Sequence, residues 1–225
     1  MSDIQIIQGD CREFLSSVPR DVAIVADPPY GISACNRSDG GVGSIVSGSK
    51  FYGRQKWDLE PANKEVIKTL LGFDRPTVIW GGNYFDVPPS SCWLVWDKMQ
   101  RDFTFADAEL AWTNIGRAVR VFSCSRGELV SEGKVHPTQK PFRLMKWCIE
   151  LLRLPPKSTI FDPYMGSGTT GVAAIQLGHN FIGCEIDPTH YATAEKRINA
   201  ELNRHPLFDK PRVAEARTPL FDAIA

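Results

Sequence analysis

Two short stretches, far apart in the chain, carry residues that could hold and modify a planar amine. The first begins at Asp27, which ends an apolar run and is followed by Pro28, Pro29 and Tyr30. The prolines lack N–H donors, so this stiff turn offers two acceptors, the Asp27 carboxylate and the Pro28 carbonyl. Two acceptors can hold both hydrogens of an amine and turn its lone pair toward an electrophile, while an aromatic ring stacks on the base. An ordinary Asp-Pro-Pro turn is the plain alternative.

The second stretch is a glycine-rich turn between two strand-like runs, from Phe161 to Gly171, with Glu185 at the tip of the next run. Glycines let the backbone approach a ligand closely, and an acid at that tip can accept both ribose hydroxyls, which predicts a nucleoside cofactor. The turn also satisfies the GxGxxG pattern, so a nicotinamide-dependent oxidoreductase is a competing interpretation. Two features oppose it. Little more than one βαβ unit fits after the turn, and nothing before it resembles a hydride-transfer site.

Length and composition fit one α/β domain in a chain of 225 residues, of which 43% are hydrophobic and 23% charged. No apolar run reaches the roughly 18 residues of a membrane helix, and no basic segment precedes an apolar one at the N-terminus, so we expect a cytoplasmic protein. The six cysteines never approach CxxC spacing, and we expect no metal site. The formal net charge of zero means that any nucleic-acid contacts depend on local charge.

The elements that must position both stretches can be read from apolar periodicity. Strand-like and helix-like segments alternate, which predicts an α/β fold with ligands at the carboxyl ends of the strands. The strand-like runs are 4–8, 22–26, 77–80, 159–162 and 180–184, and the helical segments are 11–18, 61–71, 142–154, one ending at 177, and 188–202. Closely spaced runs without helices predict an antiparallel portion at one edge of the sheet, and these are 92–96, 108–112 and 118–124.

Together the two stretches resemble the S-adenosylmethionine-dependent DNA amino-methyltransferases of the β group, in which the catalytic motif precedes the glycine motif. The resemblance covers the chain to about residue 202. It implies a Rossmann-like methyltransferase fold: a mixed, mostly parallel seven-stranded sheet with helices on both faces and a circularly permuted motif order. It implies S-adenosylmethionine as cofactor, DNA as partner, and one methyltransferase domain over 1–204 followed by a polar tail, 205–225.

The resemblance also assigns roles to single residues. Asp27 and Pro28, stiffened by Pro29, would hold the target amine, and Tyr30 would stack on the flipped base. The cofactor pocket would comprise Asp10, Cys11, Asp27, Thr138, Lys140, Phe161, Asp162, Met165, Gly166, Ser167, Gly168, Thr169, Thr170 and Glu185. Within it, Glu185 would hold the ribose, and Thr138 and Lys140 would reach the cofactor carboxylate. A helix N-cap is the plain interpretation of Asp10, and a solvated side chain that of Lys140.

Two basic segments are candidates for contacts with nucleic acid. The glycine-rich segment 31–57 holds four basic residues against one acid, and we expect a mobile loop that orders around substrate, although a solvated loop without a partner is the alternative. The second, 115–134, is a short candidate target-recognition segment, so specificity is relaxed or a second subunit of a homodimer supplies contacts. The candidate residues are Arg37, Lys50, Arg54, Lys56, Arg117, Arg120 and Arg126.

Adenine N6 is the preferred target, because in the resembled family an acid at the first motif position goes mostly with adenine and a serine with cytosine N4. Both amines suit the same pair of acceptors, so a cytosine-N4 methyltransferase is the first alternative. Stacking on Tyr30 does not distinguish sugars, which leaves an RNA methyltransferase open. A non-catalytic nucleic-acid-binding module of the same fold is a further alternative.

Overall fold

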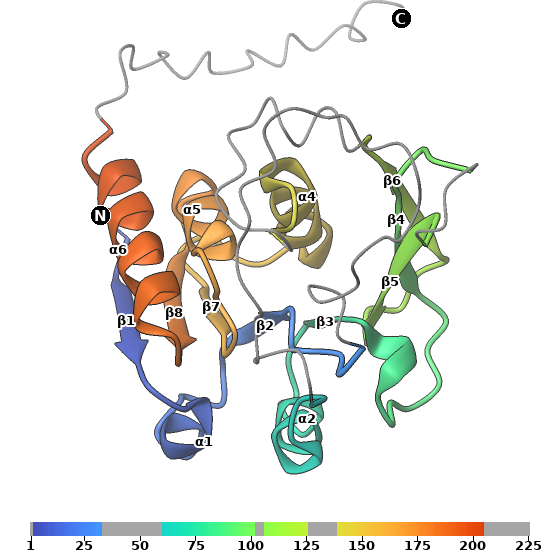
Figure 1. Cartoon of the computed structure of the whole chain (residues 1–225), viewed down its shortest axis with the longest axis horizontal. Coiled ribbons are helices and arrows are strands. Elements are labelled where there is room, and N and C mark those ends of the chain that lie inside the picture. Colours follow the sequence, from blue (N-terminus) through green and yellow to red (C-terminus); the bar gives the residue numbers. More distant parts are fainter. Residues whose placement is uncertain (1, 33–59, 102–105, 126–138, 205–225) are drawn as a thin grey trace, which may run out of the picture.

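The computed structural model describes residues 2–32, 60–101, 106–125 and 139–204, whose strands join in one sheet (Figure 1). Its eight strands lie in the order β1-β8-β7-β2-β3-β5-β4-β6. Their bounds are β1 Ile4–Gln8, β2 Ala23–Ala26, β3 Thr77–Trp80, β4 Trp93–Asp97, β5 Ala108–Thr113, β6 Arg120–Ser123, β7 Thr159–Asp162 and β8 Asn180–Glu185.

The sheet is mostly parallel, and β5 is the strand that runs against its two neighbours, β3 and β4. The other five pairings are parallel. The predicted α/β class and the mixed, mostly parallel sheet are confirmed. The prediction of seven strands was wrong, because the sheet has eight: β6 adds at the outer edge by pairing in parallel with β4.

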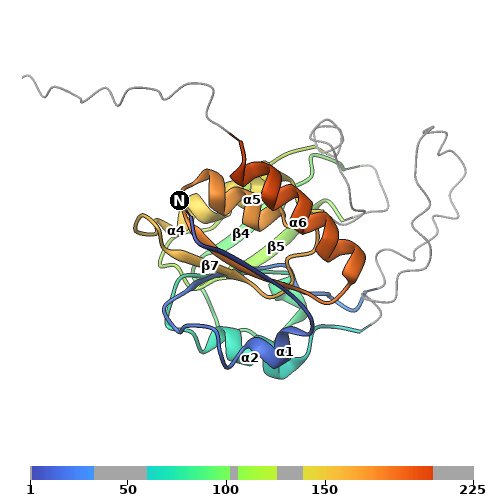
Figure 2. The ribbon, with the colours of Figure 1, turned by 90° about the vertical axis from the view of Figure 1, so that its left-hand side faces the viewer.

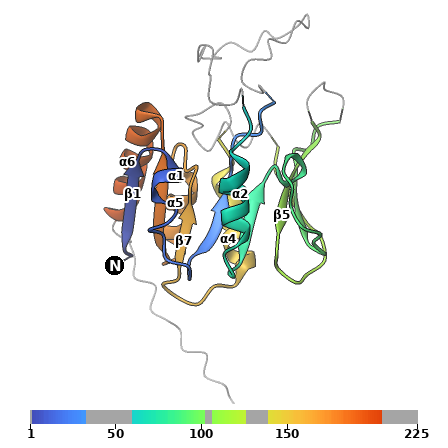
Figure 3. The same ribbon diagram turned by 90° about the horizontal axis from the view of Figure 1, so that it is seen from below.

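Helices cover both faces of the sheet, as predicted (Figure 2). Those described are α1 Cys11–Phe14, α2 Lys64–Leu71, the 3₁₀ turn η1 Gly82–Tyr84, α4 Phe142–Leu152, α5 Thr169–Gln176 and α6 Pro188–Leu202. Figure 3 shows α1 and α2 on one face, with α4, α5 and α6 on the other. None of these helices is long and apolar enough to cross a membrane, a finding limited to the described residues.

Two predicted helices differ in extent from the helices observed. The helix expected over 11–18 ends at Phe14. The helix expected to begin at Pro61 begins three residues later, because the Asn63 side chain caps it by accepting the Glu65 N–H at 2.8 Å. The predicted loop 31–57 beyond residue 32, and the tail 205–225, lie outside the described residues, so the domain boundaries remain predictions.

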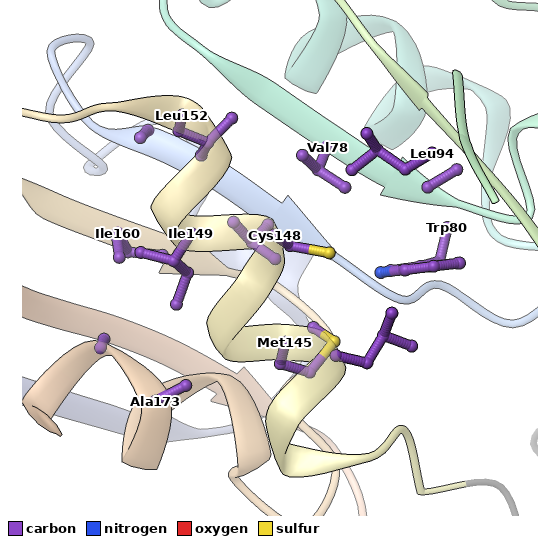
Figure 4. Close-up of a cluster of buried hydrophobic side chains, with 14 of the residues drawn as sticks. Val78, Trp80, Leu94, Met145, Cys148, Ile149, Leu152, Ile160 and Ala173 are labelled. Carbon is purple, nitrogen blue, oxygen red and sulfur yellow. The ribbon is translucent and has the colours of Figure 1, made fainter. Parts of the chain in front are cut away.

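The core lies on both faces of the central strand β2, which is fully buried. Ala23 and Val25 belong to the cluster formed with α4 and α5, whereas Ile24 and Ala26 belong to the cluster formed with α1 and α2. Figure 4 shows side chains of α4 packed over β3 and β7. A strand buried on both faces is held rigidly, so the residue that follows β2, Asp27, is fixed in position.

Candidate active site

Acidic residues end three neighbouring strands at one edge of the sheet. Strands β2, β7 and β8 are parallel and adjacent, so their carboxyl ends meet. Asp27 follows β2, while Asp162 ends β7 and Glu185 ends β8. The proximity has an electrostatic effect: Asp27 and Glu185 both contribute to the raised pKa of Asp162, although burial is its main cause. The structure therefore brings the two predicted stretches together.

The turn after β2 is fastened to the segment before α2. The Tyr30 hydroxyl donates to Asp27 Oδ1 at 2.6 Å, the Ala62 N–H donates to the Pro29 carbonyl at 2.9 Å, and Tyr30 forms a β-bridge with Pro61. Burial and the charge of Asp27 raise the pKa of Tyr30, so its hydroxyl stays protonated and remains a donor.

Two more residues after β3 shape the surroundings of Tyr30. The Tyr84 ring, 48% exposed, stacks on Tyr30 with centroids 5.2 Å apart and planes 16° apart. Gly81 has φ of 67°, and a Cβ on it would lie 2.1 Å from Tyr30 Cε1. Only glycine therefore lets the Tyr30 ring lie where it does. Sequence reasoning assigned neither residue a role, although the glycine pair ending this strand was the available signal.

Lys140 lies against the turn formed by Asp27, Pro28, Pro29 and Tyr30. Its ammonium donates to both oxygens of Asp27, at 2.7 and 2.8 Å, and to the Tyr30 hydroxyl at 3.1 Å. The side chain is only 7% exposed, so the interpretation of Lys140 as a solvated lysine was wrong. Although burial alone would lower the pKa of Lys140, the charges of Asp27 and Glu109 raise it well above its usual value. Its predicted contact with the cofactor carboxylate stays a prediction.

A second carboxylate, which sequence reasoning missed, completes a chain of four alternating charges. Glu109 Oε2 lies 3.0 Å from the Lys140 nitrogen, and Glu109 Oε1 lies 2.6 Å from the nitrogen of Lys98. Burial alone would raise the pKa of Glu109, but Lys140 and Lys98 outweigh burial and lower it to about 2. Asp27, Lys140, Glu109 and Lys98 thus neutralise one another in a partly buried row.

The glycine turn is joined to the end of β8 through Glu185. The Gly166 N–H donates to Glu185 Oε2 at 2.9 Å, and the Asp187 N–H donates to Oε1 at 2.8 Å. Gly166 has φ of 52°, and a Cβ built on it would meet no atom within 4 Å. Gly168, with φ of 77°, instead packs so closely on α6 that a Cβ would lie 2.9 Å from that of Ala194. There is therefore free space beside Gly166, whereas Gly168 is packed against α6.

Several residues predicted to bind the cofactor have side chains buried in the protein interior. Arg197 Nη1 donates to the Ser167 carbonyl and hydroxyl and to the Thr169 hydroxyl, at 2.5, 2.8 and 3.1 Å, which ties the turn to α6. Asp162 is 1% exposed and accepts the Tyr164 N–H at 3.0 Å. The buried members of the predicted set are Cys11, Lys140, Phe161, Asp162, Met165, Ser167, Gly168, Thr169 and Thr170. Thr138 lies outside the described residues.

Asp10 and Cys11 lie after β1, next to the end of β8. The Asp10 side chain accepts the Arg12 N–H at 3.0 Å and forms an ion pair with the Arg12 guanidinium, so its interpretation as an N-cap is confirmed. The Cys11 thiol is buried beside the Tyr164 hydroxyl, and burial raises its pKa. Their predicted contacts with the cofactor remain predictions.

Of the basic residues predicted to contact nucleic acid, the structure describes two, Arg117 and Arg120, and neither lies at this edge. Arg120 begins β6 and pairs with Leu94 at the start of β4, so it lies at the opposite end of the strands from Asp27. Arg117 precedes it and lines a cavity of about 350 Å³. The remaining candidates, Arg37, Lys50, Arg54, Lys56 and Arg126, lie outside the described residues. Within the described ranges, no three His, Cys, Asp or Glu residues are grouped to hold a metal ion.

Comparisons with known proteins agree with this arrangement. The type II methyltransferase M2.DpnII of Streptococcus pneumoniae is 46% identical, over 87% of this chain and 90% of that protein. The type II methyltransferase M.HinfI of Haemophilus influenzae is 40% identical, over 89% of this chain and 69% of that protein. The crystal structure of the M1.HpyAVI–SAM complex shares the fold, with a TM-score of 0.55 and 24% identity over 86% of this chain and 99% of that one. A family model described as DNA methylase, N6_N4_Mtase, matches residues 55–196, and the chain belongs to this family.

Proposed function

We propose that this protein is an S-adenosylmethionine-dependent DNA methyltransferase that acts on the exocyclic amine of a flipped base, with adenine N6 as the preferred target. One observation carries the proposal: the Asp27 turn and the Gly166–Glu185 turn lie at the same edge of the sheet, at the ends of strands that follow one another in it. The turn that would hold the target amine therefore lies beside the turn that would bind the nucleoside cofactor, as methyl transfer requires.

The cofactor half of the site suits a nucleoside. Each oxygen of Glu185 accepts one backbone N–H, which leaves lone pairs for the two ribose hydroxyls. The open space beside Gly166 leaves room for a ligand near this carboxylate. S-adenosylmethionine supplies a methyl group on a sulfonium, a strong electrophile that needs no metal. Glu185 would hold the ribose, and the Gly166 turn would lie along the methionine part.

The substrate half of the site supplies acceptors and a ring. Asp27 and the Pro28 carbonyl hold the hydrogens of the target amine, so that its lone pair points at the methyl group. Methyl transfer would form an N–C bond and break the S–C bond of the cofactor, leaving S-adenosylhomocysteine, and Asp27, which accepts a hydrogen bond from the amine, would take the released proton. The cationic Lys140 cannot accept that proton. Tyr30 stacks on the flipped base to hold its ring.

Family membership excludes one of the alternative functions and leaves others open. A nicotinamide-dependent oxidoreductase is overturned by the match to the DNA methylase family. Cytosine N4 is the second candidate target, because Asp27 and Pro28 suit either amine. A second subunit that completes the DNA contacts, and a cytoplasmic location, stay predictions.

The test is to incubate the purified full-length protein with labelled S-adenosylmethionine and unmethylated DNA of varied sequence, and then to digest the DNA to nucleosides. We expect N6-methyladenine. Recovery of N4-methylcytosine would overturn the adenine assignment, while transfer to RNA alone would overturn the DNA substrate. No transfer to any nucleic acid, with S-adenosylmethionine still bound, would favour a non-catalytic module.

A further inference from the structure

The Lys140 ammonium is hydrogen-bonded to the Asp27 carboxylate, the group that would accept the hydrogens of a target amine. It contacts both oxygens of Asp27, within 2.8 Å, and the Tyr30 hydroxyl donates to one of the same oxygens. An ammonium and an exocyclic amine are both hydrogen-bond donors, so they compete for this carboxylate. The charge of Lys140 also opposes the positive charge that reaches the amine nitrogen as the methyl group arrives. The contacts therefore describe a resting arrangement that substrate must change.

Glu109 offers Lys140 a second acceptor besides Asp27. Its Oε2 lies 3.0 Å from the Lys140 nitrogen, and Lys98 contacts its other oxygen at 2.6 Å. Burial would make an unpaired Lys140 ammonium strongly unfavourable. Because Glu109 is anionic, the ammonium can leave Asp27 and remain paired.

Aromatic rings line the space around this ammonium. The Lys140 nitrogen lies 5.5 Å from the centroid of the Trp80 ring and 5.4 Å from that of Tyr30. Figure 4 shows Trp80 beside α4, the helix that begins just after Lys140. Ring faces attract cations, so a small movement from Asp27 toward Glu109 keeps the ammonium in a favourable environment.

Building on the proposed amine methylation, we propose that Lys140 is a resident occupant of the amine site, and that Glu109 is a positioning residue that holds Lys140 when the target amine displaces it from Asp27. Lys98 keeps Glu109 in place from the other side. Glu109 touches neither substrate nor cofactor in this scheme, and it acts only through Lys140.

The test uses two variants whose effects should oppose each other. In Glu109→Gln the neutral amide is a poorer acceptor, so Lys140 binds Asp27 more tightly, and the KM for DNA should rise about tenfold with a smaller change in kcat. Adding Lys140→Met removes the competing ammonium, so the double variant should have a lower KM for DNA than Glu109→Gln alone. A merely structural Glu109 would make the double variant equal or worse. Initial rates of methyl transfer by the full chain, measured across DNA concentrations, give both constants.

Asp97→Asn is the matched control, because it removes a carboxylate at the same edge whose side chain pairs with Met99 and Arg101. Its KM for DNA should equal that of the wild type. Thermal unfolding and S-adenosylmethionine titration check every variant. If Glu109→Gln does not fold, Lys140→Met alone decides: a KM for DNA below wild type supports the inference, and an equal or higher one overturns it.

The inference is also overturned if the double variant is no better than Glu109→Gln, or if Glu109→Gln keeps the wild-type KM, while the wild type methylates DNA normally. A wild-type protein that methylates no DNA would instead contradict the proposed function itself, and with it this inference. The two failures are therefore distinguished by the wild-type reaction.

Discussion

The hydroxyl of Tyr30 donates a 2.6 Å hydrogen bond to Oδ1 of Asp27. The stacking ring and the amine acceptor therefore form one unit, and the orientation of each depends on the other. Since burial and the Asp27 charge both raise the pKa of Tyr30, the hydroxyl remains a donor at neutral pH.

Tyr30→Phe keeps the ring but removes the hydrogen bond. We expect kcat to fall about tenfold, the usual effect of losing one hydrogen bond to a charged group, with little change in the KM for DNA. Tyr30→Ala should also raise the KM for DNA, because stacking is lost. Steady-state kinetics on both variants separate the two roles, and an unchanged kcat in Tyr30→Phe would show that the hydrogen bond does not orient Asp27.

Asp27→Ala removes the acceptor while leaving the glycine turn intact. Turnover should fall about 10²–10⁴-fold, as when one preorganised group is lost, and the affinity for S-adenosylmethionine should stay close to wild type. Single-turnover rates and a calorimetric titration measure the two quantities. A variant that keeps a tenth or more of the wild-type rate would contradict the assigned role of Asp27.

Glu185→Ala should have the reverse effect. The carboxylate anchors the Gly166 and Asp187 N–H groups and is the predicted ribose acceptor, so the dissociation constant for S-adenosylmethionine should rise about 10- to 100-fold. At saturating cofactor, kcat should change much less. Glu195→Ala, in the middle of α6, is the control and should bind the cofactor normally. Equal cofactor affinity in the two variants would rule out Glu185 as the ribose acceptor.

Gly81→Ala tests the packing beneath Tyr30. The new Cβ would overlap the Tyr30 ring, so both stability and kcat should fall. Gly178→Ala is a matched control, because Gly178 also has positive φ, 76°, but a Cβ there meets no atom within 4 Å. The control should lose roughly 1 kcal/mol from backbone strain and keep its activity. If both variants have equal activity, the contact between Gly81 and Tyr30 is not functionally important.

Residues that end an apolar run were predictable as site residues. Asp27 and Glu185 follow buried parallel strands, and the carboxyl ends of such strands meet at one edge. The same reasoning predicted every described strand, because apolar runs are local signals. It could not predict Glu109, whose place depends on β5 running antiparallel, so that the start of this strand reaches the edge where the others end.

Contacts between residues far apart in the sequence also explain why Lys140 was expected in the site while its contact with Asp27 was not predicted. The family resemblance implied a role for Lys140 in the site, but its partner Asp27 is 113 positions away in the chain, and nothing local specifies that contact. The count of strands shows the reverse case: the run 118–124 was predicted as a strand and is observed as β6, Arg120–Ser123, whereas the count of seven came from the family resemblance. Sequence periodicity identifies elements, while the contacts between distant ends require the fold.

Asp162 should make stability depend on pH. Burial, partly offset by a hydrogen bond from Thr170, raises its pKa from the ordinary 3.8 to about 7. Between these values the folded protein holds a proton that the unfolded chain has released, so this carboxyl lowers stability progressively as pH rises from about 4 to about 7. Asp162→Asn stays neutral at every pH. The variant should therefore gain stability relative to wild type across this window, by at most on the order of 4 kcal/mol.

Urea unfolding at pH 5, 6, 7 and 8 measures this difference, and Asp187→Asn provides a control of opposite sign. Burial alone would raise the pKa of Asp187, but the Thr189 and His190 N–H groups that it accepts lower it. The charge of Asp187 therefore stabilises the fold above the ordinary pKa, and the cost of Asp187→Asn should shrink only in acid, as pH falls through the lowered pKa. A stability difference between Asp162→Asn and wild type that is constant from pH 5 to pH 8 would mean that Asp162 is ionised in the folded protein, and its burial would then need a cation to offset it.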